Sequence, residues 1–454
     1  MKKLHSKSPR WSLRAALRGA AAVALVALSS GAQAETLTQS LADAYRHSGL
    51  LDQNRAVLRA ADEDVATAVA ALRPSLTYAL RSTYTGGPGA STEGFSTTLR
   101  LTSELTIYDF GRNKLAIEAQ KETVLATRQL LLQVEQTVLQ AAVNAYFSVR
   151  EEFETVSIIQ NNVRLITEEL RAAEDRFEVG EVTRTDVAVA ESRLASARAD
   201  LASARGNLTI AAAAFREAVG RAPGGLTAPR SLPRLPASVA EAKAIARRTS
   251  PSILQARHEI TAAELTLERA KKALYPTLSG TATTSISEGD VLNTGRSDNI
   301  AITLGGPISQ GGALNSAIRR SRAALDGARA NLHVTRHAVD EAVETAFASF
   351  GVARARIMAT DEQIRDAHVA YRGTREEASL GARTTLDVLD AEQELLDARA
   401  DKIAAVAAEY RAAYSVLASM GRLTAKDLGL PVQLYDPAGY YQLVKAAPQY
   451  LPNS

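Results

Sequence analysis

The sequence from Arg112 to Val179 reads RNKLAIEAQK ETVLATRQLL LQVEQTVLQA AVNAYFSVRE EFETVSIIQN NVRLITEELR AAEDRFEV. These 68 residues contain no glycine or proline, and they are bounded by Gly111 and Gly180. As one unbroken helix they would extend roughly 100 Å at about 1.5 Å per residue. Such a helix is much longer than those of ordinary globular domains, so we expect it to pack against other long helices.

The last part of this stretch contains apolar residues at alternating spacings of three and four. A second series of apolar residues begins beyond Gly180. The first series is Val156, Ile159, Val163, Ile166, Leu170, Ala173 and Phe177. In the second, large residues recur every seven positions with alanines between them: Val187, Leu194, Leu201, Leu208 and Phe215, with Ala190, Ala197, Ala204 and Ala211. Both patterns are typical of coiled-coil seams. They predict an antiparallel helical hairpin with its tip near residues 178–185.

The sequence contains an internal duplication, because the residues of the tip recur 201 positions later. The clearest repeated pairs are Gly180 and Gly381, Thr183 and Thr384, and Asp186 and Asp387. A period this long indicates a duplicated half and not a short solenoid repeat. We expect a first repeat at 35–220, a proline-rich junction at 221–250, a second repeat at 251–420 and an irregular tail at 421–454. Each repeat should contain two shorter helices, two strands, a long helix, the tip and a return helix.

The expected strands alternate apolar and polar residues. Residues 95–107 alternate over thirteen positions, which is longer than the roughly 9–11 residues of a membrane-barrel strand. The other strands are expected at 76–85, 277–287 and 298–309. An ordinary half-buried hairpin is the alternative, but two equivalent hairpins favour a barrel. Four strands cannot close a membrane barrel, so copies of the chain must pool their strands, and a working conduit favours three copies with twelve strands.

The N-terminal residues 1–34 are expected to be a secretory signal peptide. Six basic residues precede an apolar run that is too short to cross a bilayer, and Ala32-Gln33-Ala34 suits cleavage. Removing them would change the formal charge from +3 to −3, so the pI near 9.0 does not indicate nucleic-acid binding. The chain has no cysteine, which excludes disulfides, thiolate metal sites and an N-terminal lipid anchor.

The two tip segments resemble those of the TolC family of outer-membrane channel proteins. They read RFEVGEVTRTDV from Arg176 to Val187 and GARTTLDVLDA from Gly381 to Ala391, and the resemblance extends over residues 37–428. It implies a mainly α-helical protein whose long hairpins form a trimeric α-barrel. The four strands of each chain would contribute to a twelve-stranded β-barrel held in outer-membrane lipid of a Gram-negative bacterium, with the helices extending into the periplasm.

The same resemblance implies partners and site residues. The partners would be two further copies in a homotrimer, a periplasmic adaptor (membrane fusion) protein and an inner-membrane transporter, either ABC or proton-driven. Asp387 and Asp390 would form a periplasmic constriction ring, and Arg383 would latch the gate by contacting Thr185 and Asp186. A tyrosine of the family's latch corresponds to Ala378. The tips that dock the adaptor would be Val179, Gly180, Val182, Thr183, Leu380, Gly381 and Thr384.

Simpler interpretations remain open for several of these residues. Threonine capping and a carboxylate near a helix dipole also explain Thr185-Asp186 and Thr385-Leu386-Asp387. For Asp390, a solvated helix face is the alternative. His333 and His337 are four residues apart but lack a metallohydrolase motif. The sequence shows no nucleophile–base set, phosphate loop, cofactor site or metal cluster, so we do not expect an enzyme. The resemblance to the TolC family implies a passive conduit for drugs or polypeptides. The alternative is a periplasmic coiled-coil adaptor or scaffold without channel activity.

Overall fold

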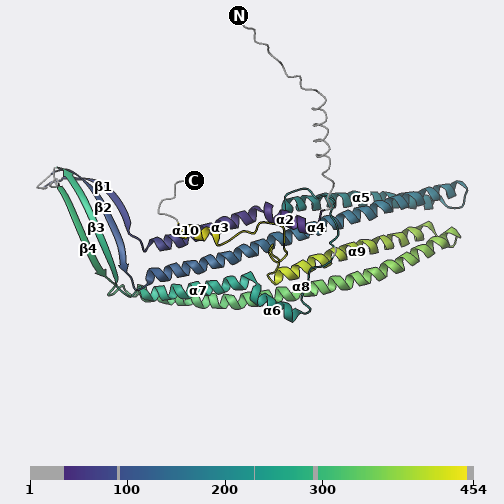
Figure 1. Cartoon of the computed structure of the whole chain (residues 1–454). Helices are drawn as coiled ribbons and strands as arrows, with labels where there is room; N and C mark the ends of the chain where they lie inside the picture. The colour runs from purple at the N-terminus through teal and green to yellow at the C-terminus, as the bar shows by residue number, and fades with distance from the viewer. Residues whose placement is uncertain (1–34, 89–92, 230, 290–294, 447–454) are drawn as a thin grey trace, which may run out of the picture.

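The computed structural model describes residues 35–88, 93–229, 231–289 and 295–446 (Figure 1). The expected signal peptide at 1–34 and the last eight residues of the expected tail lie outside the described residues. Within the described ranges, no helix has the length and apolar character needed to cross a bilayer.

Each half of the chain contains a short helix, a longer helix, two strands, a 67-residue helix and a return helix. In the first half these are α2 (Leu37–His47), α3 (Gly49–Ala70), β1 (Ser75–Thr85), β2 (Gly94–Tyr108), α4 (Arg112–Glu178) and α5 (Arg184–Val219). In the second they are α6 (Val239–Thr249), α7 (Pro251–Lys272), β3 (Thr277–Gly289), β4 (Gly295–Gly305), α8 (Ala313–Ser379) and α9 (Thr385–Ser419). The predicted two-repeat, mainly helical fold is confirmed.

Two expectations about element limits are wrong. The tail carries a helix, α10 (Gly439–Ala446), which packs against α3. The last strand, β4, ends at Gly305 and does not continue to residue 309. Pro307 has no backbone N–H to donate to the ladder, and glycines precede it, so the strand stops there.

The helices form an elongated bundle with the sheet at one end (Figure 1). Two shorter helices, α3 and α5, lie in line along the long α4, while α7 and α9 do the same along α8. Contacts of α4 with α7 and α9 join the two halves. The turns of the two hairpins, α4–α5 and α8–α9, lie together at the end farthest from the strands (Figure 1).

The sheet is antiparallel with strand order β1-β2-β3-β4, so β1 and β4 each leave one edge unpaired within a single chain. Its register places apolar residues opposite one another, as in the pairs Tyr78 with Leu101 and Leu99 with Ile286. Large side chains on this face are open to solvent in one chain, with Tyr78 80% and Ile300 86% exposed. A single copy therefore exposes both an apolar sheet face and two unpaired edges.

The waist of the bundle holds the main core. Tyr146 of α4 is fully buried, and its hydroxyl donates a hydrogen bond to the carbonyl of Thr227 at 2.6 Å and lies 3.0 Å from that of Glu35. On the other side, the ring of Phe147 stacks on Tyr410 of α9 at a centroid distance of 4.8 Å. These contacts hold the segment before α2, the junction segment and α9 of the second hairpin against the middle of α4.

Candidate functional site

The two long helices, α4 and α8, each end in a turn of the same conformation. Gly180 and Gly381 follow the helices with φ of 76° and 77°, a left-handed conformation that glycine adopts without steric cost. The amide of Glu181 donates to the carbonyl of Arg176 at 2.9 Å, and Ala382 donates to Glu377 at 2.9 Å. Together with the glycine amides, which bond the carbonyls of Phe177 and Ala378, these bonds form Schellman motifs. The duplication therefore extends to the hydrogen bonds of the turns.

Both return helices begin with a capping box. Thr183 accepts from the amide of Asp186 at 3.3 Å, and the Asp186 carboxylate accepts from the amide of Thr183 at 2.9 Å. Thr384 and Asp387 make the equivalent bonds at 3.2 and 2.9 Å. The threonine side chains also donate to these carboxylates.

These bonds favour ionised aspartates at both helix starts. The bonds from the Thr183 side chain and backbone hold the pKa of Asp186 below its usual value. The backbone and then the side chain of Thr384 do the same to the pKa of Asp387. The capping interpretation thus describes both aspartates in one chain, although the capping threonines are Thr183 and Thr384. Thr185 and Thr385 lie in the first turns of α5 and α9, so their expected capping roles are wrong.

The expected latch and ring residues make other contacts within one chain. The Nε of Arg383 lies 2.9 Å from Glu377 Oε2, and this bond raises the pKa of the guanidinium. Arg383 forms no ion pair with Asp186 among the described contacts of one copy. Asp390 forms an ion pair with Arg193 of α5, which connects the two hairpins near their tips. One copy therefore leaves Asp387 as the ring carboxylate with no ion pair among the described residues.

Apolar side chains are exposed at the turns themselves. Val179 is 70% and Leu380 84% exposed, each beside its turn glycine. The other residues expected to dock an adaptor lie in the same two turns or cap the helices that follow them: Gly180, Val182, Thr183, Gly381 and Thr384. Exposed apolar tips on paired rigid helices can insert between the helices of another protein.

A buried carboxylate lies farther up the second hairpin. Glu392 of α9 is 5% exposed, and neither of its carboxylate oxygens has a hydrogen-bond partner among the described residues. It borders a cavity of about 100 Å³ that Asn162, Tyr371 and Arg399 also line. Burial, and secondarily the nearby Glu169, raise the pKa of Glu392 to about 7.

Sequence reasoning missed Glu392 and the Arg193–Asp390 ion pair. The duplication equates Glu392 with Glu191, which is exposed because α5 packs mainly on α4. In contrast, α9 packs against both α8 and α4 and so buries a second face. The spacing of the apolar residues could have predicted that Glu392 is buried, because it lies four residues after Val388 and three before Leu395, and both of these are buried.

The described residues contain no cluster of three or more side chains suited to hold a metal ion. His333 and His337, which were considered as a metal pair, line a surface hollow together with arginines. Arginine donates hydrogen bonds and is always cationic, so this hollow suits anions and not metal cations.

Comparison with known proteins gives consistent matches. The family model described as "Outer membrane efflux protein" matches residues 40–221 and 244–422. The outer membrane efflux protein BepC of Brucella suis is 35% identical over 437 residues, covering 94% of each chain. The outer membrane protein TolC of Escherichia coli is 26% identical, covering 83% of this chain and 80% of that protein. The CmeC channel of Campylobacter jejuni has a similar fold, with a TM-score of 0.76 at 16% identity over 90% and 89% of the chains.

Proposed function

This chain belongs to the outer membrane efflux protein family and is an outer-membrane efflux channel of Gram-negative bacteria, and from that premise we propose that it is the exit duct of a tripartite export system. An inner-membrane transporter of the ABC or proton-driven type would supply the substrate. A periplasmic adaptor would join that transporter to the hairpin tips. The duct itself would conduct passively, without enzymatic chemistry.

The observation that carries this proposal is the incomplete sheet. Channels of this family are homotrimers. Each copy contributes four strands with both edges unpaired and a large exposed apolar face. In lipid, unpaired backbone groups are unfavourable and only a closed barrel satisfies them. Three copies of this chain would close twelve strands, and their hairpins would continue the passage into the periplasm.

The gate would lie at the tips. Three copies would bring three Asp387 side chains, which form no ion pair among the described residues of one copy, and three Asp390 side chains, each paired with Arg193, around one axis. Rings of carboxylates favour cations. Arg383 would exchange its exposed bond to Glu377 for Thr185 and Asp186 of a neighbouring copy. Exposed ion pairs contribute about 1 kcal/mol or less each, which suits a contact that must open and close.

The adaptor would dock at the two turns. Val179 and Leu380 offer apolar contact area. The left-handed glycines have no side chain, so the backbone of each turn stays accessible to a partner. Because the turns repeat in each half, a trimer presents six nearly equivalent tips to the adaptor. Drugs and secreted polypeptides are both compatible cargoes, since the transporter selects the substrate.

The gate is tested by planar-bilayer conductance of the purified protein. Replacing both ring carboxylates, Asp387→Ala with Asp390→Ala, should reduce the preference for cations and weaken block by multivalent cations. The control removes the same charge from exposed helix positions, Glu191→Ala with Glu394→Ala. Equal selectivity in the ring variant and the wild type would contradict a carboxylate constriction.

Cell fractionation distinguishes the duct from the periplasmic scaffold considered from sequence. A duct is found with the outer membrane as a heat-resistant oligomer, whereas a scaffold remains in the soluble periplasmic fraction. Family membership and the exposed apolar sheet face both count against the scaffold.

A further inference from the structure

A large cavity lies at the waist of the bundle, beside the segment that follows α9. It has a volume of about 630 Å³, and its walls come from α2, α3, α4, the end of α6, the start of α7 and residues 421–437. Cavities of this size accommodate small organic ligands. We name it the waist pocket.

The wall of the waist pocket is mainly apolar. Six leucines, two tyrosines and two prolines line it. Leu51 and Tyr45 are buried members of the main core. The amide of Tyr435 donates a hydrogen bond to the hydroxyl of Tyr45 at 3.4 Å, which holds the last segment of the wall against α2. An apolar ligand body on this wall would remove both surfaces from water, which is favourable.

The charged groups of the pocket leave an excess of positive charge. Four cations and two carboxylates line it, which gives a net charge of +2. Both carboxylates already have partners. Glu135 accepts a hydrogen bond from the amide of Ala425 at 2.6 Å. Asp427 accepts from the hydroxyl of Thr424 at 3.0 Å and from the guanidinium of Arg422 at 3.3 Å.

Three of the four cations have no carboxylate partner. Arg55 pairs with Asp52 at 2.8 Å. Within the described ranges, the other three cations that line the pocket form no ion pair: Arg128, Arg248 and Lys426. The buried Asp62 lies near Arg128 without forming an ion pair with it. The pocket therefore has cations available for an external anion.

Unmet hydrogen-bonding capacity gathers at the same place. The Nε atoms of Arg55 and Arg128 and the Oε1 atom of Gln129 are buried and have no hydrogen-bond partner among the described residues. All three residues line the waist pocket. Buried polar atoms without partners are unfavourable, so a bound polar group that completes these hydrogen bonds would be stabilising.

The pocket lies away from the edges along which copies of the chain would meet. Contacts between the helices near the sheet place them in the order α3, α4, α7 and α8. The free sheet edges, β1 and β4, adjoin the outer two of these helices, α3 and α8. The waist pocket takes most of its helical wall from α4, between those edges. Ring closure would therefore leave it open to a ligand.

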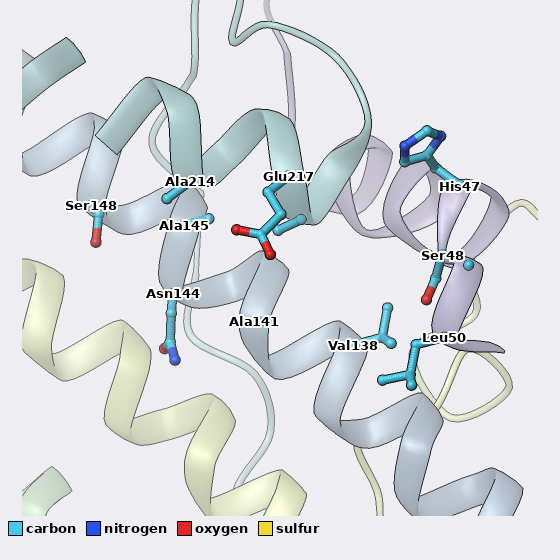
Figure 2. A pocket seen from close by; sticks show the side chains of 12 residues that line it. His47, Ser48, Leu50, Val138, Ala141, Asn144, Ala145, Ser148, Ala214 and Glu217 are labelled. Atoms are coloured by element: carbon cyan, nitrogen blue, oxygen red, sulfur yellow. The ribbon is translucent and has the colours of Figure 1, made fainter. Parts of the chain in front are cut away.

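A second cavity of similar volume provides an internal comparison. It measures about 620 Å³ and lies at the α2–α3 corner, bordered also by α4 and α5. Figure 2 shows Glu217 of α5 directed toward its interior. Its lining includes His47 but no lysine or arginine. A carboxylate ligand should therefore prefer the waist pocket.

We propose that the waist pocket binds an amphipathic organic anion, namely a carboxylate carried on an aromatic or aliphatic body. The body would lie on the leucines, and the unpaired cations would hold the carboxylate through charge-assisted hydrogen bonds. Because its walls come from residues 45–55, 125–135, 248–254 and 421–437, such a ligand would connect both halves of the chain with the tail. Binding to the folded state alone should then raise the unfolding temperature.

Titration calorimetry of the full-length assembly in a neutral detergent tests the ligand class, with naphthoate as the probe. We expect one naphthoate site per chain. Naphthamide, which keeps the aromatic body without the charge, should bind about tenfold more weakly or less, and acetate should give no measurable heat. Absence of naphthoate binding, or equal affinities for naphthoate and naphthamide, would overturn the proposal.

Two tryptophan variants test the location. Leu434→Trp narrows the waist pocket, and Leu50→Trp narrows the cavity of Figure 2. The two leucines are 48% and 44% exposed, so each position has room for a larger side chain. Leu434→Trp should abolish naphthoate binding and Leu50→Trp should leave it unchanged.

A charge variant tests the cations in the same assay. Arg128→Gln with Lys426→Gln should lower the affinity for naphthoate to that for naphthamide. The control, Arg319→Gln with Arg320→Gln, removes the same charge from exposed positions of α8 and should bind as the wild type does. Naphthoate binding that persists unchanged in both Leu434→Trp and the pocket charge variant would overturn the assignment to the waist pocket.

Discussion

Glu392 differs from its repeat counterpart Glu191 in what surrounds it, although the local sequences are similar. The carboxyl group lies between α9, α8 and α4 and faces Glu169, Tyr371 and the guanidiniums of Arg375 and Arg399. On the α5 side, Arg193 is held by Asp390 and not by Glu392. The group therefore binds its proton more tightly in the folded hairpin than in an unfolded chain.

We expect the hairpin around Glu392 to lose stability as pH rises. The pKa of about 7 lies above the ordinary 4.5, so this stabilisation is complete below about pH 4.5 and is lost as pH rises through 7. The gap between these values corresponds to about 3 kcal/mol. Hydrogen exchange of the α9 amides near residue 392 should accelerate between about pH 5 and pH 8, after correction for intrinsic rates.

The variant Glu392→Gln should remove most of that pH dependence, because an amide does not titrate. Glu191→Gln, at the exposed equivalent position, serves as the matched control and should behave as the wild type. An unchanged pH profile in Glu392→Gln would show that other groups control the opening of this hairpin.

The two capping aspartates allow a comparison of stability with selectivity. Asparagine keeps a side-chain oxygen that can accept the threonine amide hydrogen, so Asp186→Asn and Asp387→Asn should each cost only a small amount of stability, from the lost charge near the helix dipole. Only Asp387→Asn should lower cation selectivity, measured as the reversal potential in a salt gradient. Equal selectivity losses in both variants would contradict the assignment of Asp387 to the constriction.

At the scale of elements, the hairpin turns depend on two glycines in the left-handed region. Nothing lies within 4 Å of a side-chain carbon built at Gly180 or Gly381, so only the backbone conformation disfavours a larger residue. The two turns should therefore respond alike to substitution.

Replacing either turn glycine by alanine, Gly180→Ala or Gly381→Ala, should destabilise the local hairpin by about 1–2 kcal/mol. The matched control is Gly206→Ala, in the interior of α5 with equally open surroundings, which should stabilise the helix by about 0.5–1 kcal/mol. Hydrogen exchange at the tips measures the turn variants, and exchange of the α5 amides near residue 206 measures the control. A turn variant as stable as the wild type would mean that the turn adopts another conformation.

The sequence predicted the long helices and both tips closely because glycines bound them and the apolar seam is regular. It placed β4 too far along, since alternation alone does not register the proline after Gly305. It predicted capping at the tips by Thr185 and Thr385, whereas Thr183 and Thr384 cap the helices, because the capping threonine depends on where the extended backbone ends.

The sequence pattern could not predict burial that depends on packing against a third helix. Glu392 and Glu191 share the same local pattern, and only the packing of α9 against α4 separates them. The contacts of Arg383 likewise depend on neighbouring helices, and those in an assembly depend on other copies. The periodicity of the apolar seam identifies the face of a helix that packs in its own hairpin. It does not identify a second face that packs against another helix.

At the scale of the whole molecule, the two ends expose different kinds of groups. The sheet end exposes an apolar face and unpaired strand edges, whereas the tip end exposes charged and capping groups together with the apolar side chains of Val179 and Leu380. The bundle between them fixes their separation. The four described strands of one copy form an open sheet, so conduction requires the copies to meet along their flanks.

The most direct measurement is the native mass of the full-length protein extracted from the outer membrane in mild detergent. The expected result is a single species with the mass of three mature chains, which accommodates twelve strands in one closed sheet. A stable monomer that needs no lipid or detergent, with its strand edges paired internally, would contradict the duct.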